Sequence, residues 1–172
     1  MVGNFDGTNF LADPPPNGVV VFQGFEGNGT FADLGWTATG GLIGTSPAQG
    51  TLPGQQTMTG YQGNRLVNTF LNGDQTTRTL TSPSFNVMHK NINFLIGGGN
   101  FPGQECISLI IEGQVVLTAT GSNNELLVPE TWDVTAFIGQ VAVIEIVDSL
   151  TGGWGHINID EITFSDPSDI VF

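Results

Sequence analysis

Short apolar runs, separated by turns rich in glycine and proline, constrain the fold of this chain more than any other feature of its sequence. Successive side chains of a strand point to opposite faces, so alternating runs indicate strands with one buried face. The 25 glycines and nine prolines interrupt regular structure between the runs. We expect strands at residues 19–22, 65–70, 92–96, 107–111, 114–118, 132–134, 141–147 and 157–164.

Strands at this spacing, without helical periodicity between them, predict an all-β fold, a β-sandwich of the jelly-roll type. Glu112-Gly113 is typical of a two-residue turn, which predicts a hairpin over residues 107–118. Residues 133–139 have the pattern of one helical turn. A length of 172 residues, 39% of them hydrophobic, fits one domain. We assign residues 1–18 to a tail and proline-rich connector, 19–166 to the sandwich and 167–172 to a C-terminal tail.

The charge of the chain restricts its partners. Sixteen acidic residues against three basic ones give a formal net charge of −13, which repels nucleic acid and anionic membrane surfaces. No run of about 18 apolar residues is present, so we expect no membrane span. The acidic residues are spread along the chain, which suits a secreted, extracellular domain. Carbohydrates and divalent cations remain compatible partners.

Cysteine and histidine are too few for several common kinds of site. Cys106 is the only cysteine, so an intrachain disulfide is excluded, and its apolar surroundings predict a buried small residue. A catalytic cysteine would need nearby positive charge, which this chain almost lacks. One cysteine with the separated His89 and His156 does not make a zinc site.

The turn before the last predicted strand is built to present side chains. Trp154 and His156 stand among three glycines, at positions 152, 153 and 155, between two alternating apolar runs. The glycines free the backbone around Trp154 to adopt conformations that are closed to other residues. This pattern favours a binding loop. The alternative is that Trp154 closes the end of the core and His156 forms local hydrogen bonds.

Several segments, in a fixed order, carry a resemblance to a known family. They are residues 50–56 (GTLPGQQ), 63–70 (GNRLVNTF), 73–74 (GD), 80–85 (LTSPSF), 92–100 (INFLIGGGN) and 152–157 (GGWGHI). Together they resemble the fructan-binding module of levanases and related fructan hydrolases, carbohydrate-binding module family 66, from about residue 21 to residue 166. The resemblance implies a β-sandwich with a non-catalytic pocket for the terminal fructose of a fructan chain.

The same segments contain side chains suited to sugar hydroxyls. Arginine offers planar donors, carboxylates accept hydrogen bonds, asparagine and histidine do both, and glycine lets backbone amides approach a ligand. For Arg65 the alternative is a salt bridge, and for Asp74 it is a stabilised turn; Arg78 is a weaker candidate. The candidate ligand-binding residues are Arg65, Asn68, Asp74, Gly98, Gly99, Asn100, Asp148, Trp154 and His156.

A structural calcium ion is a further expectation. Glu26 and Asp160 lie where the first and last strands of a sandwich would meet, and both offer the oxygen ligands that calcium prefers.

The sequence favours one function over two others. We expect a non-enzymatic module that recognises terminal fructose units of levan-like β-fructans and targets an attached or partner hydrolase. The alternative is a secreted structural or adhesive subunit that self-assembles into a homo-oligomer or polymer, its N-terminal segment adding a strand to a neighbour's sheet. A glycoside hydrolase would need two facing carboxylates. Nothing in the sequence singles out Asp74 and Asp148 as such a pair.

Overall fold

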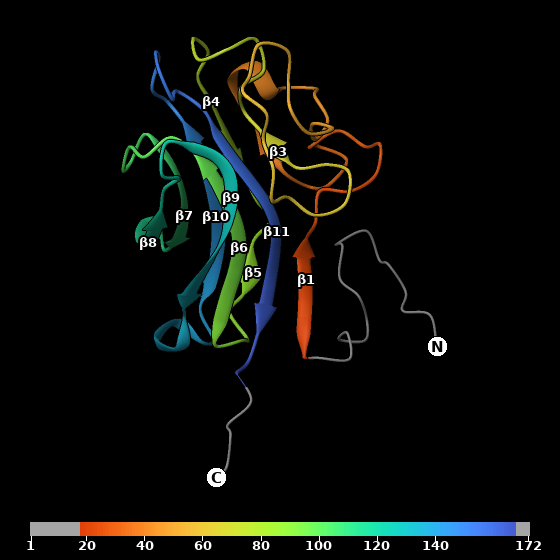
Figure 1. Cartoon of the computed structure of the whole chain (residues 1–172). Helices are drawn as coiled ribbons and strands as arrows, with labels where there is room; N and C mark the ends of the chain where they lie inside the picture. Colours follow the sequence, from red (N-terminus) through yellow and green to blue (C-terminus); the bar gives the residue numbers. More distant parts are fainter. Residues whose placement is uncertain (1–17, 168–172) are drawn as a thin grey trace.

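The computed structural model describes residues 18–167, which form two antiparallel sheets packed face to face (Figure 1). The first sheet has the order β1 (Val19–Gln23), β11 (Ile157–Ser165), β6 (Asn91–Gly98) and β9 (Asn124–Asp133), and β3 (Val67–Asn68) also pairs with β11. The second sheet has the order β2 (Thr37–Ala38), β4 (Arg78–Thr81), β10 (Val141–Asp148), β7 (Glu105–Ile111) and β8 (Gln114–Ala119), and β5 (Phe85–Asn86) pairs with β10.

The topology is that of a jelly roll. The order β1-β11-β6-β9 faces the order β4-β10-β7-β8, and the chain crosses between the sheets at nearly every connection. The predicted all-β sandwich is therefore confirmed. The helical elements of residues 18–167 are two 3-10 turns, Gly40–Leu42 and Thr135–Phe137, and the second lies in the predicted helical turn. Neither is long or apolar enough to span a membrane.

The core lies between the sheets and follows from strand alternation. In β10, Ala142, Ile144 and Ile146 are buried, whereas the residues between them are partly exposed. One end of the core is aromatic, because the rings of Phe22 and Phe85 lie 4.9 Å apart and pack against Phe164. Cys106 is buried and free, as expected.

The hairpin of β7 and β8 is confirmed. Ile111 pairs with Gln114, so Glu112 and Gly113 form the turn, with φ angles of 51° and 75°. Positive φ at both central residues is the geometry that fits the twist of the flanking strands.

Two strand predictions had wrong bounds. The strand predicted at 132–134 is the end of β9, which begins at Asn124. Proline is uncommon inside strands, so Pro129 hides the first part of β9 in the sequence. β9 is an edge strand, however, and a missing backbone donor costs little there. The strand predicted at 65–70 is shorter, Val67–Asn68. The tails assigned to residues 1–18 and 167–172 lie outside the described residues, except for Gly18 and Pro167.

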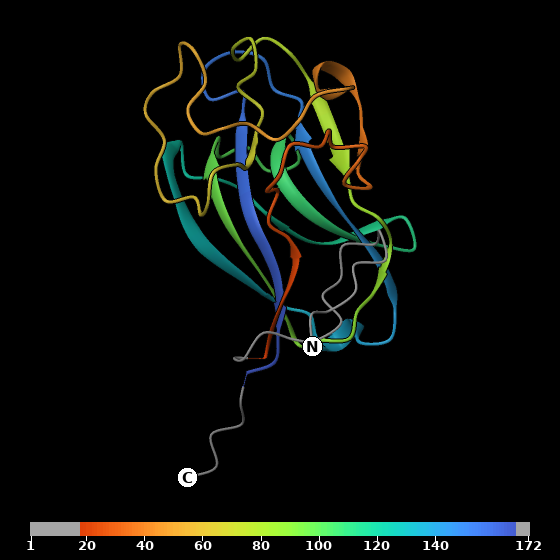
Figure 2. The same cartoon turned by 90° about the vertical axis from the view of Figure 1, so that its right-hand side faces the viewer.

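A long segment between β1 and β4 covers one end of the outer face of the first sheet. Residues 24–77 contain only the short β2, β3 and one 3-10 turn, and Figure 2 shows their loops gathered at one end of the sandwich. Met58 and Leu66 of this segment pack on Leu127 as a small second core. Because of this cover, Asn158 and Asp160 of β11 are fully buried.

Candidate functional site

A polar hollow of about 300 Å³ lies where the covering segment meets the turn between β10 and β11. Three parts of the chain far apart in sequence form its wall, together with the start of β9. The lining residues are Gly54, Gln55, Gln56, Phe70, Asp74, Glu125, Gly153, Trp154 and His156.

The turn that carries Trp154 and His156 is tightly tied to the rest of the wall. The Gly152 amide donates to the carbonyl of Asp74 at 2.8 Å, and the Gly155 amide donates to the carbonyl of Gly152 at 2.8 Å. A Cβ on Gly155 would collide with the carbonyls of Leu150 and Gly152, so the position requires glycine. Trp154 has a φ of 63°, which is uncommon for a residue with a side chain. This backbone fixes the Trp154 ring at the hollow.

The imidazole ring of His156 lies between two carboxylates and contacts both. Its Nδ1 lies 2.7 Å from Oδ1 of Asp74, and its Nε2 lies 3.0 Å from Oε1 of Glu125. Burial lowers the pKa of His156, but the hydrogen bonds and charges of Glu125 and Asp74 outweigh it, and the net effect is a raised pKa. The Trp154 ring stacks on His156 with 5.6 Å between centroids, and Phe70 meets it edge-on at 5.0 Å.

A second layer of amides holds Glu125. Its Oε2 accepts hydrogen bonds from Gln55 Nε2 at 3.0 Å and Asn158 Nδ2 at 2.9 Å. Asn68 Nδ2 donates to Gln55 Oε1 at 2.7 Å, so the amides form a continuous network behind the hollow. Such a network fixes side-chain positions before any ligand arrives.

The structure places the predicted ligand-binding residues in different surroundings. It brings together Asp74, Trp154 and His156 in the wall of the hollow, with Asn68 directly behind. Gly98 and Gly99 lie beneath the turn, where a Cβ on either would collide with the carbonyl of His156 or Trp154. They make room for the turn itself.

The remaining predicted ligand-binding residues do not line the hollow. Asp148 is buried below it, with an exposed fraction of 1%, and is paired with Arg78. Arg65 donates to the carbonyl of Pro47 at 2.8 Å and to Asn28 at 3.1 Å. Asn100 is exposed on another loop and accepts a hydrogen bond from Thr120 at 2.9 Å.

Sequence reasoning missed Glu125, Gln55 and Phe70 as parts of the wall. Gln55 and Phe70 stand in segments that carry the family resemblance, so their positions were open to inference. Glu125 was not, because it is the second residue of β9 and the start of that strand was not recognised. The residues beside Glu125 carry no local signal of a site, since its partners lie in other segments.

Glu26 and Asp160 lie near each other, as the calcium expectation requires. Burial raises the pKa of Asp160 to about 7, amide hydrogen bonds from Gln62 and Glu161 oppose the rise, and the charges of Glu161 and Glu26 add to it. Glu26 accepts hydrogen bonds from the Asn64 and Arg65 amides. Within residues 18–167, no three His, Cys, Asp or Glu side chains form a ready-made metal cluster. A calcium ion here would therefore need backbone carbonyls as ligands.

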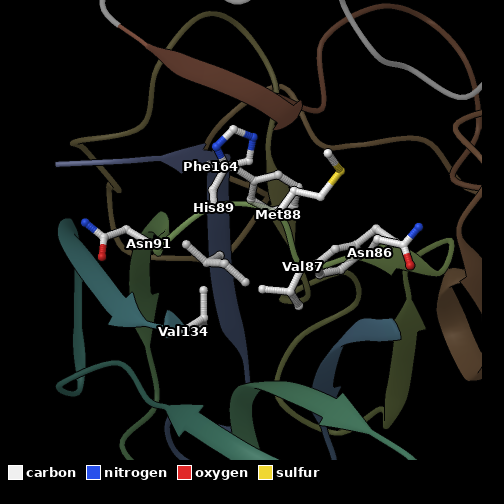
Figure 3. Close-up of a pocket in the computed structure, with 9 residues that line it drawn as sticks. Asn86, Val87, Met88, His89, Asn91, Val134 and Phe164 are labelled. Atoms are coloured by element: carbon white, nitrogen blue, oxygen red, sulfur yellow. The ribbon is translucent and has the colours of Figure 1, made fainter. Parts of the chain in front are cut away.

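A second concavity, near the start of β1, has a different chemistry. Figure 3 shows Val87, Val134 and Phe164 around a small cavity beside Met88, and a groove of about 390 Å³ adjoins it. His89 contributes a polar group, but its Nδ1 is already bonded to Asp166 at 2.9 Å. This groove offers few of the polar groups that orient a sugar.

The chain is similar to part of a longer protein. The protein ecdE of Aspergillus rugulosus, which is provisionally named as a glycosyl hydrolase, is 49% identical over 173 residues. The alignment covers 96% of this chain and 25% of ecdE, so the chain spans about a quarter of that relative's length. No protein-family model matches the chain.

Solved structures resemble the fold. The K2 cleaved adhesin domain of Lys-gingipain matches with a TM-score of 0.53 and 15% identity, over 83% of this chain and 97% of that one. TmCBM61 in complex with β-1,4-galactotriose matches with a TM-score of 0.46 and 12% identity, over 83% and 99%. The first match supports the sandwich architecture, and at these identities neither match extends beyond the fold.

Proposed function

We propose that this chain is a non-catalytic carbohydrate-binding domain that receives the terminal fructose unit of levan-like β-fructans. The observation that carries the proposal is the hollow walled by Trp154, Phe70 and the Asp74–His156–Glu125 group. An aromatic surface beside fixed hydrogen-bonding groups suits a sugar, which has both apolar faces and hydroxyls.

The size and charge of the hollow support a small neutral ligand. A volume of about 300 Å³ is at the lower end of the range for small-molecule sites. Carboxylates in the wall accept hydrogen bonds from hydroxyls and repel anions, so sugar acids and phosphates are disfavoured. The choice of fructose over other sugars rests on the family resemblance of the segments that form the wall.

The similarity to ecdE supports an association with a hydrolase. Because ecdE is about four times as long as the matched region, this chain corresponds to one part of that protein. We propose that the domain is secreted and that it holds an attached or partner glycoside hydrolase on its substrate. Asp148 is buried away from the hollow, and the two carboxylates that line it, Asp74 and Glu125, are both bonded to His156, which supports binding without turnover.

Gel retardation tests the proposal. Native gels that contain levan, inulin or a glucan should retard the domain in levan, leave it unaffected in the glucan, and release no free sugar on incubation. Equal mobility in all three gels would refute fructan binding. Released fructose would refute the non-catalytic part.

We also propose a structural calcium ion at Glu26 and Asp160. Glu161 and Glu26 lie close enough to Asp160 for their charges to raise its pKa. Within residues 18–167, none of these three carboxyl groups forms an ion pair with a basic side chain. A divalent cation would relieve this repulsion. Glu161 has a φ of 50° in a strand with a register shift, which shapes the backbone around the cluster.

Self-assembly by strand addition is the second candidate function, favoured by one observation. Within residues 18–167, the sheet order places β1 at an edge beside β11, and its sequence, VVVFQ, has no charged residue or proline to block a further strand. Light scattering should then give a larger particle for the full chain than for a chain that starts at Val19. Equal particle sizes would remove this candidate.

A further inference from the structure

Three ionisable side chains stand in one row across the inner face of the second sheet, at the end beneath the hollow. Asp148 of β10 pairs in register with Arg78 of β4 on one side and with Glu105 of β7 on the other. Their exposed fractions are 3% for Arg78, 1% for Asp148 and 0% for Glu105. The row is therefore a buried cluster of one guanidinium and two carboxyl groups.

The charges of this row do not balance if both carboxyl groups are ionised. Arg78 Nε lies 3.4 Å from Asp148 Oδ2 and Nη2 donates to the carbonyl of Leu71 at 2.9 Å, so the single positive charge of the row lies beside Asp148. Glu105 stands on the opposite side of Asp148, and two like charges directly opposite each other in a buried sheet repel strongly. No donor within the described part of the chain reaches Oε2 of Glu105. A proton shared between the two carboxyl groups supplies both the missing donor and the charge balance.

The surrounding groups favour the same state. Burial raises the pKa of Glu105 to about 9, and the charge of Asp148 adds to the rise. Burial raises the pKa of Asp148 to about 6, although the Thr69 hydroxyl and the charges of Arg78 and His156 oppose it. Burial lowers the pKa of Arg78, and the two carboxylates oppose that change.

Glu105 is joined to the binding turn by its other oxygen. The Leu150 amide donates to Oε1 of Glu105 at 2.9 Å, and the Ser149 amide donates to the carbonyl of Gln104 at 2.8 Å. The start of the turn that carries Trp154 is thus fixed on residues 104 and 105. Gly99 packs between Glu105 and the carbonyl of Trp154, so a change at Glu105 reaches the turn directly.

We propose that Glu105 is a positioning residue that is protonated in the folded protein and donates a hydrogen bond to Asp148. This hydrogen bond holds residues 149–156 where Trp154 and His156 face the hollow. This inference rests on the proposed sugar-binding function of that hollow. Loss of the proton at alkaline pH places two negative charges side by side and loosens the turn. Sugar affinity then falls although no wall residue has changed.

Glu105→Gln separates this role from a purely structural one. Its neutral amide can donate to Asp148 and accept from Leu150 without any titratable proton. The matched control is Glu112→Gln, which removes one charge from the exposed β7–β8 turn. We expect levan affinity of the wild type and of Glu112→Gln to fall about tenfold as the pH rises through about 9. Glu105→Gln should bind like the wild type at pH 7 and should lose less affinity than the wild type or Glu112→Gln at alkaline pH, where deprotonation of His156 weakens the wall in all three proteins.

A second measurement needs no sugar. Infrared spectra at pH 8, above the pKa of Asp160 of about 7 and below that of Glu105, should contain the carbonyl band of a buried protonated carboxylic acid in the wild type and in Glu112→Gln, and this band should be largely lost in Glu105→Gln. Absence of the band from the wild type, or equal alkaline loss of affinity in Glu105→Gln, would overturn the inference. Presence of the band with no binding to any sugar would refute the proposed function alone.

Discussion

Glu125 and His156, 31 residues apart in sequence, are joined by a 3.0 Å contact between Oε1 and Nε2 at the floor of the hollow. Nδ1 of the same ring faces Asp74 at 2.7 Å. A neutral imidazole has one N–H, so both contacts are donated hydrogen bonds only when the ring is protonated. The imidazolium therefore ties the start of β9 and the loop at Asp74 to the turn that carries Trp154.

Glu125→Gln should lower the pKa of His156, because it removes one of the two carboxylates that hold the imidazolium. A fall of about one unit is expected for the loss of one close charge. Titration of the imidazole C–H signals by nuclear magnetic resonance measures it. His89, the second histidine, is bonded to Asp166 and serves as the internal control. An unchanged His156 titration would mean that Glu125 does not hold the protonated ring.

The free energy of unfolding should increase as the pH falls from about 9 to about 5. Glu105, Asp148 and Asp160 have folded-state pKa values of about 9, 6 and 7, above their ordinary values of 4.5, 3.8 and 3.8. The folded state therefore binds more protons than the unfolded state across this window, and stability is lost as the pH rises. His156, whose pKa is also raised, acts in the same direction.

Melting curves in excess chelator at several pH values measure this trend. The melting temperature should be several degrees higher at pH 5 than at pH 8. A higher melting temperature at pH 8 would contradict the buried, protonated carboxyl groups.

Arg78→Met should destabilise the domain by about 3 to 5 kcal/mol, because it leaves Asp148 buried without its partner. Combining it with Asp148→Asn removes the unpaired charge and should restore part of the loss. Urea unfolding of the wild type, both single variants and the double variant measures the coupling. Equal midpoints for Arg78→Met and the wild type would show that the buried pair contributes nothing.

Calcium should raise the melting temperature more at pH 8 than at pH 5, because Asp160, with a pKa of about 7, is ionised only at the higher pH. Magnesium is the control, since it prefers to keep its own water ligands. Glu161→Gln, which removes a neighbouring charge, should reduce the calcium effect. Identical melting in excess calcium and excess chelator at pH 8 would exclude the site.

The fold was largely predictable because alternation and turn chemistry are local. The hairpin at Glu112-Gly113 and the sandwich class followed from them. β9 was cut short because Pro129 is read as a strand breaker, and only the sheet order shows that this strand lies at an edge. The site was less predictable. Trp154 and His156 were evident from their turn, whereas Glu125 and Glu105 acquire roles only through partners on other strands.

Calorimetric titration of the wild type and of Trp154→Ala with levan, fructose and a glucan tests the central claim most directly. Trp154 is half-buried at the rim, so its loss should leave the fold intact. We predict saturable heat for levan and fructose with the wild type, none with the glucan, and at least about tenfold weaker binding, or about 1.4 kcal/mol, in Trp154→Ala. No heat of binding for the wild type with any of the three sugars, or unchanged levan binding in Trp154→Ala, would contradict the account.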